Sequence, residues 1–221
     1  MLINSQTEEN YLKAIFKLSQ VEDSSVSTNS IAKELGTKAS SVTDMLKKLK
    51  TKKLLNYEKY KGVTLTKSGN KTAANIIRKH RLWEVFLVEK LKFNWDEVHE
   101  IAEQLEHIKS KDLVKKLDQF LGNPKFDPHG GPIPNIDGVF PKSEAILLSE
   151  LSKGTKGIVI GVKESSAKFL QYIESLNLGL GAAVKIEEVV EFDQSFQIKI
   201  GSKLQHISNE VAKNILLNVH D

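Results

Sequence analysis

Thr28-Asn-Ser-Ile-Ala-Lys-Glu-Leu-Gly36-Thr-Lys-Ala-Ser-Ser41-Val-Thr-Asp-Met-Leu-Lys-Lys-Leu49 contains two short helix patterns separated by a tight turn. Ser27 or Thr28 can cap the first helix, residues 29–35, and Gly36 can end it. Ser40 or Ser41 can cap the second, which continues to about Lys52. Its apolar residues recur at helical spacing and predict one buried face: Val42, Met45, Leu46 and Leu49.

The flanking segments complete a small domain around these two helices. Before them, residues 8–19 predict a helix that Thr7 caps, with Glu8 and Glu9 in its first turn. After them, residues 54–57 and 63–65 read as two strands joined by a turn at Lys61-Gly62. This order predicts a winged helix-turn-helix, in which residues 41–52 form the recognition helix.

The positive charge of the chain is concentrated in this first part. Residues 1–72 carry 13 Lys against 7 Asp and Glu, whereas the whole chain has a formal net charge of only +4. Such a surface attracts phosphate, although a small α+β domain with a solvated charged face would have the same composition. The candidate DNA-contacting residues lie on the outer face of the recognition helix and at the wing tip: Ser40, Ser41, Thr43, Asp44, Lys47, Lys48, Lys59 and Lys61.

The middle of the chain predicts three further helices, residues 67–90, 97–108 and 112–121. They are rich in large apolar residues, and the surplus apolar surface suits a homodimer interface. A regulator that reads two operator half-sites on double-stranded DNA needs such two-fold symmetry.

These middle helices also carry potential metal ligands. In His99-Glu-Ile-Ala-Glu103-Gln-Leu-Glu106-His107, the imidazoles and two of the carboxylates recur at i, i+4, i+7 and i+8, which places them on one stripe of a helix. Upstream, His80 and Glu84 form another i, i+4 pair. Solvated His–Glu pairs are common on helices, but six such residues on two consecutive helices indicate a metal site, since buried charges need a partner.

After the middle helices the residue pattern changes from helical to strand-like. Residues 156–162, 183–190 and 197–200 are strand-like, a helix is expected over 166–176, and together they predict a small β-barrel with one helix. The chain has no Cys, which excludes disulfides and thiolate metal ligands. No stretch is typical of a signal peptide or a membrane span, so we expect a cytoplasmic protein without a membrane partner.

The chain resembles the diphtheria toxin repressor and manganese transport regulator family of metal-dependent transcriptional repressors over nearly its whole length. The segments that carry the resemblance are residues 7–15, 41–49, 65–69, 78–84, 98–107 and 127–130, among which Arg78-Lys-His-Arg81 with the His/Glu helix is the most specific. The implied fold is mainly α with small β parts: a winged helix-turn-helix domain, 1–72; a helical metal-binding and dimerisation domain, 73–140; and an SH3-like (FeoA-like) β-barrel, 141–221.

The resemblance also implies two neighbouring metal positions. The primary one would use Glu103, Glu106 and His107 with Asn10, and the ancillary one His80, Glu84 and His99. In manganese-responsive members the residue matching His80 joins the main cluster. Asn10 replaces a Met or Asp, and its neutral amide oxygen is a weaker ligand. Lys13 stands where some members have Glu, and Glu164 is the nearest match to a ligand from the third domain.

Oxygen and imidazole ligands favour a hard divalent ion, so Mn²⁺ is the first choice and Fe²⁺ the second. Zn²⁺, Co²⁺ or Ni²⁺ would also bind in vitro. We therefore expect a homodimeric repressor that senses Mn²⁺ or Fe²⁺ and controls metal-uptake genes. The alternatives are a metal-independent winged-helix regulator with a structural metal site and a metal-dependent enzyme, although the chain has no recognisable nucleophile, phosphate loop or cofactor motif.

Overall fold

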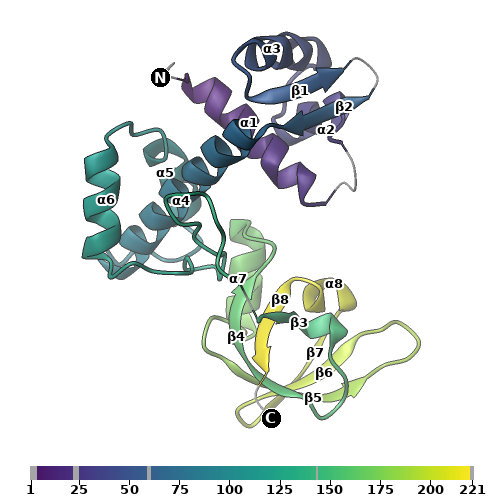
Figure 1. Cartoon of the computed structure of the whole chain (residues 1–221). Helices are drawn as coiled ribbons and strands as arrows, with labels where there is room; N and C mark the ends of the chain where they lie inside the picture. The colour runs from purple at the N-terminus through teal and green to yellow at the C-terminus, as the bar shows by residue number, and fades with distance from the viewer. Residues whose placement is uncertain (1–3, 22–24, 59–60, 143, 220–221) are drawn as a thin grey trace. The chain divides into compact units, whose positions relative to one another are not determined.

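The structure is a computed structural model that describes residues 4–21, 25–58, 61–142 and 144–219 (Figure 1). It divides into two compact units. Unit 1 comprises Met1–His80, Gln104–Val114 and Pro134–Phe140, and unit 2 comprises Arg81–Glu103, Lys115–Ile133 and Pro141–Asp221. The three domain boundaries expected from the sequence stay a prediction.

The first elements of unit 1 form the expected winged helix-turn-helix. They are α1 (Gln6–Ser19), α2 (Thr28–Glu34), α3 (Ala39–Thr51), β1 (Leu55–Glu58) and β2 (Gly62–Leu65). The two strands pair antiparallel, with Tyr57 opposite Val63, and Figure 1 shows this wing beside α3. Their apolar faces meet in one core, whose fully buried members include Leu12, Ile15, Ile31, Val42, Leu46 and Leu49.

Two of the expected helix caps in this domain are wrong. Ser5, rather than Thr7, caps α1: its side chain accepts from the amide of Glu8, and the Glu8 carboxylate accepts from the amide of Ser5. This reciprocal capping box starts the helix two residues earlier than expected. Helix α3 begins at Ala39 after Lys38, which makes no side-chain cap, so Ser40 and Ser41 lie inside its first turn.

The helices of the middle region are α4 (Lys67–Glu89), α5 (Val98–Leu105) and α6 (Lys111–Phe120). The expected helix over residues 97–108 is therefore too long, because α5 ends at Leu105. Glu106 and His107 lie in the turn after it, where tertiary contacts to α1 and α4 replace further helical turns. The single stripe of four ligands expected on one helix is thus wrong, since only His99 and Glu103 remain on α5.

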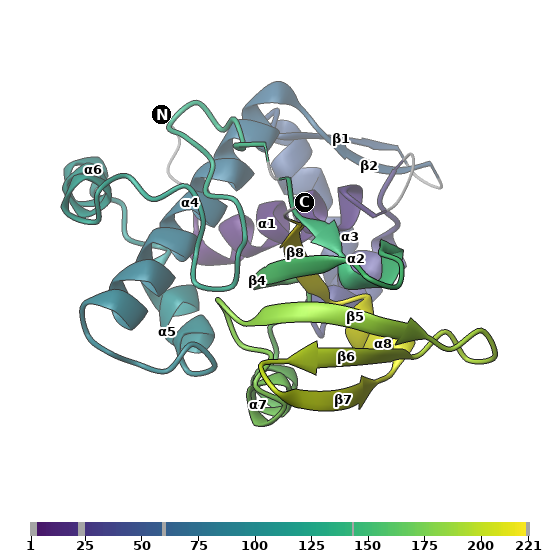
Figure 2. The same cartoon turned by 90° about the horizontal axis from the view of Figure 1, so that it is seen from below.

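The C-terminal part, within unit 2, is an antiparallel sheet with two helices. Figure 2 shows β5, β6 and β7 side by side, and the full strand order is β3-β8-β4-β5-β6-β7. The sequence located three of these strands and missed the others. The elements are β3 (Ile146–Leu147), a 3-10 turn (Leu148–Glu150), β4 (Lys156–Val162), α7 (Ala167–Ser175), β5 (Ala183–Val189), β6 (Phe196–Ile200), β7 (Lys203–Ile207), α8 (Asn209–Ala212) and β8 (Ile215–Val219).

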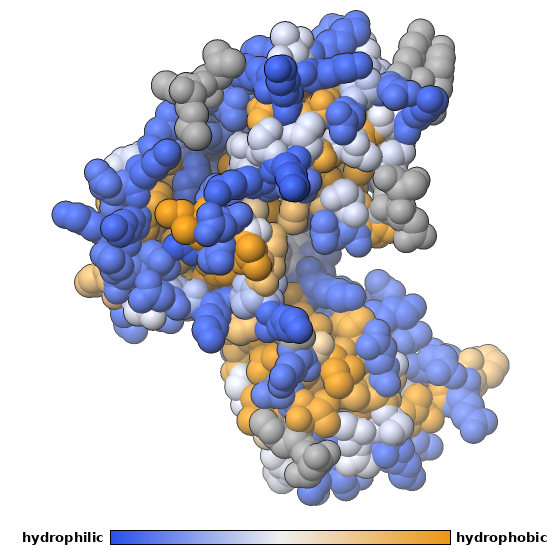
Figure 3. All heavy atoms as spheres, in the orientation of Figure 1, coloured by the Kyte–Doolittle hydropathy of each residue, from blue (hydrophilic) through white to orange (hydrophobic). Residues whose placement is uncertain are grey.

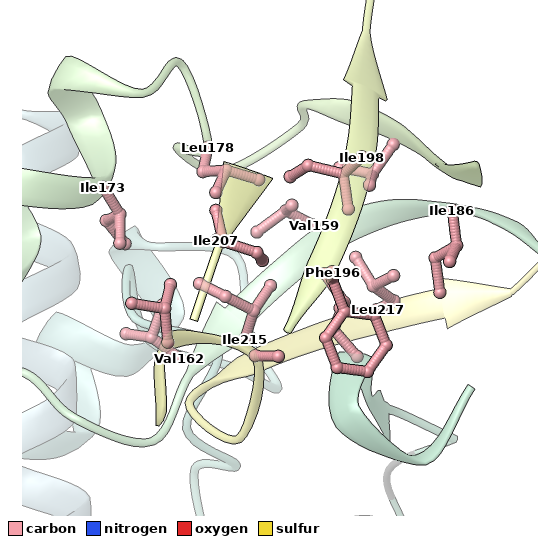
Figure 4. Close-up of a cluster of buried hydrophobic side chains, with 14 of the residues drawn as sticks. Val159, Val162, Ile173, Leu178, Ile186, Phe196, Ile198, Ile207, Ile215 and Leu217 are labelled. Carbon is pink, nitrogen blue, oxygen red and sulfur yellow. The ribbon is translucent and has the colours of Figure 1, made fainter. Parts of the chain in front are cut away.

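The sheet and α7 enclose an apolar core. Figure 4 shows side chains from β4, β6 and β8 pointing toward one another, among them Val159, Ile198 and Leu217, each at most 1% exposed. Burial of each such side chain is worth roughly 1.5–3 kcal/mol. In the view of Figure 3, hydrophobic residues also gather on the visible face of this part of the chain.

Among the described residues, no helix has the length and apolarity to cross a membrane.

A glycine lets the 126–133 segment approach this sheet, also within unit 2. The amide of Val162 donates to the His129 carbonyl at 2.8 Å. A Cβ at Gly161 would lie 2.7 Å from that same carbonyl oxygen, so any larger residue would push the segment away. The position of His129 therefore depends on this close approach.

Candidate metal centres and DNA interface

The outer face of α3 presents the polar residues that the sequence nominated for DNA contact. Thr43 is half-buried and donates to the Ala39 carbonyl, whereas Lys47 pairs with Asp44 at 3.3 Å. Lys61, on the wing, pairs with Glu58 at 2.7 Å. Exposed pairs of this kind are weak, and phosphate can replace the carboxylate. Lys59 lies outside the described residues; the nominated residues that are exposed are Ser40, Ser41, Asp44, Lys47, Lys48 and Lys61.

Helix α3 is tied to α1 through Glu8. The Glu8 side chain is 1% exposed, and its carboxylate lies 2.8 Å from Lys52 Nζ and 3.3 Å from Lys48 Nζ. Burial favours the neutral acid, but the two lysines and the Ser5 amide outweigh it and lower the pKa of Glu8 to about 2. The recognition helix is thus held by a charged residue that immediately precedes Glu9 and Asn10.

In unit 1, six residues from α1, α4 and the turn after α5 form what we call the Glu106 cluster: Glu9, Asn10, Lys13, His80, Glu106 and His107. Glu106 is its centre, with a side chain that is 0% exposed. Its Oε2 atom lies 2.7 Å from both Lys13 Nζ and His80 Nδ1. Burial opposes ionisation of Glu106, but these two partners keep its pKa below the usual range, so Glu106 is a carboxylate.

Two oxygen atoms of this cluster are buried without a hydrogen-bond partner, Asn10 Oδ1 and Glu106 Oε1. His107 Nε2 lies 3.9 Å from the second of these atoms, Glu106 Oε1. Its other nitrogen, Nδ1, lies 2.7 Å from Glu9 Oε2 and donates to that carboxylate, which leaves the Nε2 lone pair available. Buried acceptors without donors are costly, and a bound cation would satisfy them.

In unit 2, a second group of residues, the Glu84 cluster, surrounds a buried carboxylate of α4: Glu84, His99, Glu103, Asp127 and His129. His99 on α5 lies between two carboxylates, with Nδ1 3.4 Å from Glu84 and Nε2 3.6 Å from Glu103. Within this cluster, ligand atoms of Glu84, Asp127 and His129 all lie within 4.8 Å of one another, close enough to hold one metal ion.

The 126–133 segment delivers its two members of this cluster in fixed orientations. His129 Nε2 lies 2.8 Å from the Trp95 carbonyl, which can only accept, so Nδ1 is left facing Glu84 Oε2 at 3.6 Å. Burial lowers the pKa of His129, but Glu84 outweighs this and holds it above its usual value. Asp127 accepts from the amides of His129 and Gly131, both at 2.8 Å, and pairs with Arg81 Nε at 3.0 Å.

The structure thus sorts the nominated ligands differently from the sequence. Glu106, His107 and His80 share the Glu106 cluster with Asn10, whereas Glu103 pairs with His99 at 3.6 Å. Glu164 lies beyond β4, where its carboxylate accepts from the amide of Ser166 at 2.7 Å. The sequence missed Glu9, Asp127 and His129 as functional residues. The signals were the Asp127-Pro-His-Gly130 motif and the position of Glu9 beside Asn10.

Comparisons with known proteins agree with this arrangement along the chain. Residues 4–63 match the iron dependent repressor N-terminal DNA binding domain, residues 66–135 the iron dependent repressor metal binding and dimerisation domain, and residues 146–219 the FeoA domain. The iron-dependent repressor IdeR of Mycobacterium tuberculosis is 32% identical over 161 residues, which cover 70% of this chain and 70% of that protein.

Solved structures are similar over nearly the whole chain. A manganese-dependent transcriptional repressor in complex with manganese is 33% identical, with a TM-score of 0.85 over 96% of this chain and 100% of that one. ScaR with bound Zn²⁺ is 31% identical, with a TM-score of 0.79 over 96% of this chain and 98% of that one.

The winged helix-turn-helix fold and the two family matches define the class of protein. It is a DNA-binding transcription regulator with a metal-binding dimerisation domain. The chain belongs to the diphtheria toxin repressor, IdeR and manganese regulator family of metal-dependent repressors. This confirms the fold class and the resemblance, together with operator DNA and a second copy of the chain as partners. It also excludes the enzyme alternative, because members of the family are transcriptional repressors.

Proposed function

We propose that this repressor responds to Mn²⁺, with Fe²⁺ as the second choice, and that it represses metal-uptake genes. The donors of both clusters are carboxylate and amide oxygens and imidazole nitrogens, and the chain has no Cys. Such a set favours a hard divalent ion over a thiophilic one. The Mn²⁺ and Zn²⁺ in the similar structures support a divalent ion.

The atoms best suited to hold the regulatory ion are Asn10 Oδ1, Glu106 Oε1 and His107 Nε2. A bound divalent cation would supply positive charge and ligand bonds that join α1 to the turn after α5. The residues around it have supporting tasks: Glu9 orients the His107 ring, and His80 holds the other oxygen of Glu106. We propose the Glu84 cluster as a second site, with Glu84 and His129 as ligands beside His99.

One observation carries the proposal: α1 contributes to both the Glu106 cluster and the support of the recognition helix. Glu8 contacts Lys48 and Lys52 of the α3 region, the next residue, Glu9, contacts His107, and the following one, Asn10, has a buried oxygen without a hydrogen-bond partner. If metal binding fixes α1 at the Glu106 cluster, the adjacent Glu8 side chain also fixes α3. Coupling between such sites is typically about 1–3 kcal/mol.

The dimer surface of the family has a candidate location in unit 2. The Phe86 ring packs against Trp83 at 5.7 Å and against Phe120 at 6.4 Å between ring centroids. Phe120 is nevertheless 65% exposed, and Leu91 and Phe93 are also exposed. Exposed aromatic and aliphatic groups beside a packed aromatic core are typical of a surface that a second copy covers.

The direct test is operator binding by the full-length protein, first with chelator and then with Mn²⁺ or Fe²⁺. We expect affinity to rise about 10- to 100-fold with metal. His107→Ala should remove that rise but leave a dimer, whereas Glu100→Gln, on the exposed side of α5, should behave as wild type. Equal affinity in chelator and metal would contradict the proposal and favour a metal-independent regulator with a structural site.

A further inference from the structure

Lys13 occupies an unusual place for a lysine, because it contacts the buried carboxylate that the metal would use. Its Nζ atom lies 2.7 Å from Glu106 Oε2, and its side chain is only 16% exposed. The partner, Glu106, is fully buried. A buried ion pair of this geometry is held firmly, since neither group can exchange its partner for water without moving.

The two carboxylate charges of the Glu106 cluster are balanced by Lys13 and by the neighbouring Lys79. Glu9 and Glu106 contribute two negative charges, and Lys13 and Lys79 supply two positive ones, with Lys79 Nζ 4.0 Å from Glu9. A divalent cation added to this set would leave an excess of two positive charges in a buried place. The cation and the lysine ammonium groups would then repel one another strongly, because little water is present to screen their charges.

The two oxygens of Glu106 face different partners. Oε2 is held by Lys13 and His80, whereas Oε1 has no hydrogen-bond partner and lies toward His107 Nε2. A carboxylate whose one oxygen is bound to an ammonium group has less negative charge to offer at the other. Lys13 thus weakens the Glu106 ligand by binding its other oxygen.

We propose that Lys13 is a built-in cation that competes with the metal for Glu106 and so sets the metal concentration at which this centre fills. Lys79 does not do the same, because it contacts Glu9 and the Ile108 carbonyl rather than a ligand oxygen. The role is one of tuning: Lys13 neutralises Glu106 when metal is scarce and lowers affinity to the range in which a sensor must respond. The inference rests on the proposed metal response.

The test compares Lys13→Met, which keeps the apolar stem, with Lys13→Arg, which keeps the charge. Mn²⁺ affinity of the full-length protein is measured by competition with a metal-binding dye, and thermal stability is measured in chelator. Lys17→Met is the matched control, since Lys17 lies on the same helix but is 69% exposed and pairs with Glu34. We expect Lys13→Met to bind Mn²⁺ about tenfold more tightly and to melt lower in chelator. Lys13→Arg and Lys17→Met should stay within about twofold of wild type in affinity.

The outcomes separate this inference from the function on which it rests. If the wild-type protein binds no Mn²⁺, the proposed function fails before any variant is made. If the wild type binds Mn²⁺ and Lys13→Met has equal or weaker affinity, the competition is overturned while the function stands. If Lys13→Met folds only with Mn²⁺ present, the ion replaces the lost charge and the proposal is supported; failure to fold even with Mn²⁺ would overturn it.

Discussion

The Glu106 cluster buries two oxygen atoms that have no hydrogen-bond partner, whereas Asp127 in the Glu84 cluster binds two amides and an arginine. Both clusters combine buried carboxylates with histidines, so composition does not distinguish them. What differs is how completely each is satisfied by the protein itself. The first leaves two buried oxygens without a donor and includes α1 of the DNA-binding domain; in the second, Asp127 is paired with Arg81 and with two amides. We therefore expect the Glu106 cluster to control the metal response and the Glu84 cluster to contribute mainly to stability.

The largest expected effect breaks the Glu84 cluster. In Asp127→Ala, Arg81 loses its buried partner and two amides lose their acceptor, so we expect a loss of about 3–5 kcal/mol in unfolding free energy. Urea denaturation in chelator measures it. Asp127→Asn keeps an acceptor for the amides and should lose less. Wild-type stability in Asp127→Ala would show that this network is not structural.

The next comparison exchanges one carboxylate in each cluster for its isosteric amide. Glu106→Gln should abolish the metal-dependent gain in operator affinity, about 10- to 100-fold, because it removes the charge at the centre of the cluster that includes α1. Glu84→Gln should retain most of that gain. Operator titrations with Mn²⁺ and with chelator measure both. If Glu84→Gln had the greater effect, the roles of the two clusters would be reversed.

A smaller effect is expected from Glu9, which touches His107 rather than the metal. In Glu9→Gln the His107 imidazole loses the charged hydrogen-bond acceptor that lies 2.7 Å from Nδ1. Its Nε2 atom then becomes a weaker metal ligand. We expect Mn²⁺ affinity to fall about tenfold. Glu34→Gln, exposed at the end of α2, is a suitable control. An unchanged affinity would mean that the His107 ring is oriented by packing alone.

The sequence was sufficient to predict elements that depend on neighbouring residues. It was insufficient for elements whose ends or pairing depend on contacts with distant residues. The winged helix was predicted from helical periodicity and a two-strand turn, because those signals lie within a few residues. The end of α5 was missed: Glu106 continues the helical pattern, but its contacts with His80 and Lys13 hold it in a turn. Strand β7, Lys-Leu-Gln-His-Ile, was missed because it is a mostly exposed edge strand defined by pairing with β6.

The separation of Glu103 from Glu106 has the same origin. Three residues apart, they would share a face if the helix continued, and the sequence assigned them to one site. The helix ends between them, so Glu103 stays on α5 and pairs with His99, whereas Glu106 lies in the following turn and contacts His80 and Lys13. Their assignment to one metal site stays a prediction. Asn10 shows the reverse case. Its residue type makes it a weak ligand, but its buried and unpaired oxygen is what identifies it in the structure.

The smallest expected effect concerns Glu8, which connects the Glu106 cluster to α3. The pKa of Glu8 is about 2 in the folded protein against an ordinary 4.5, so folding favours its charged form. Its contribution to stability is fully present above about pH 4.5 and is lost as the pH falls toward 2. Glu8→Gln keeps a capping side chain but removes the charge that binds Lys52. We expect it to cost about 1–2 kcal/mol at pH 7 and progressively less between pH 4.5 and 3. Denaturation of both proteins across this range measures the difference. A gap that stayed constant with pH would mean that Glu8 acts through packing, and the proposed path from the metal centre to the recognition helix would lose its charged link.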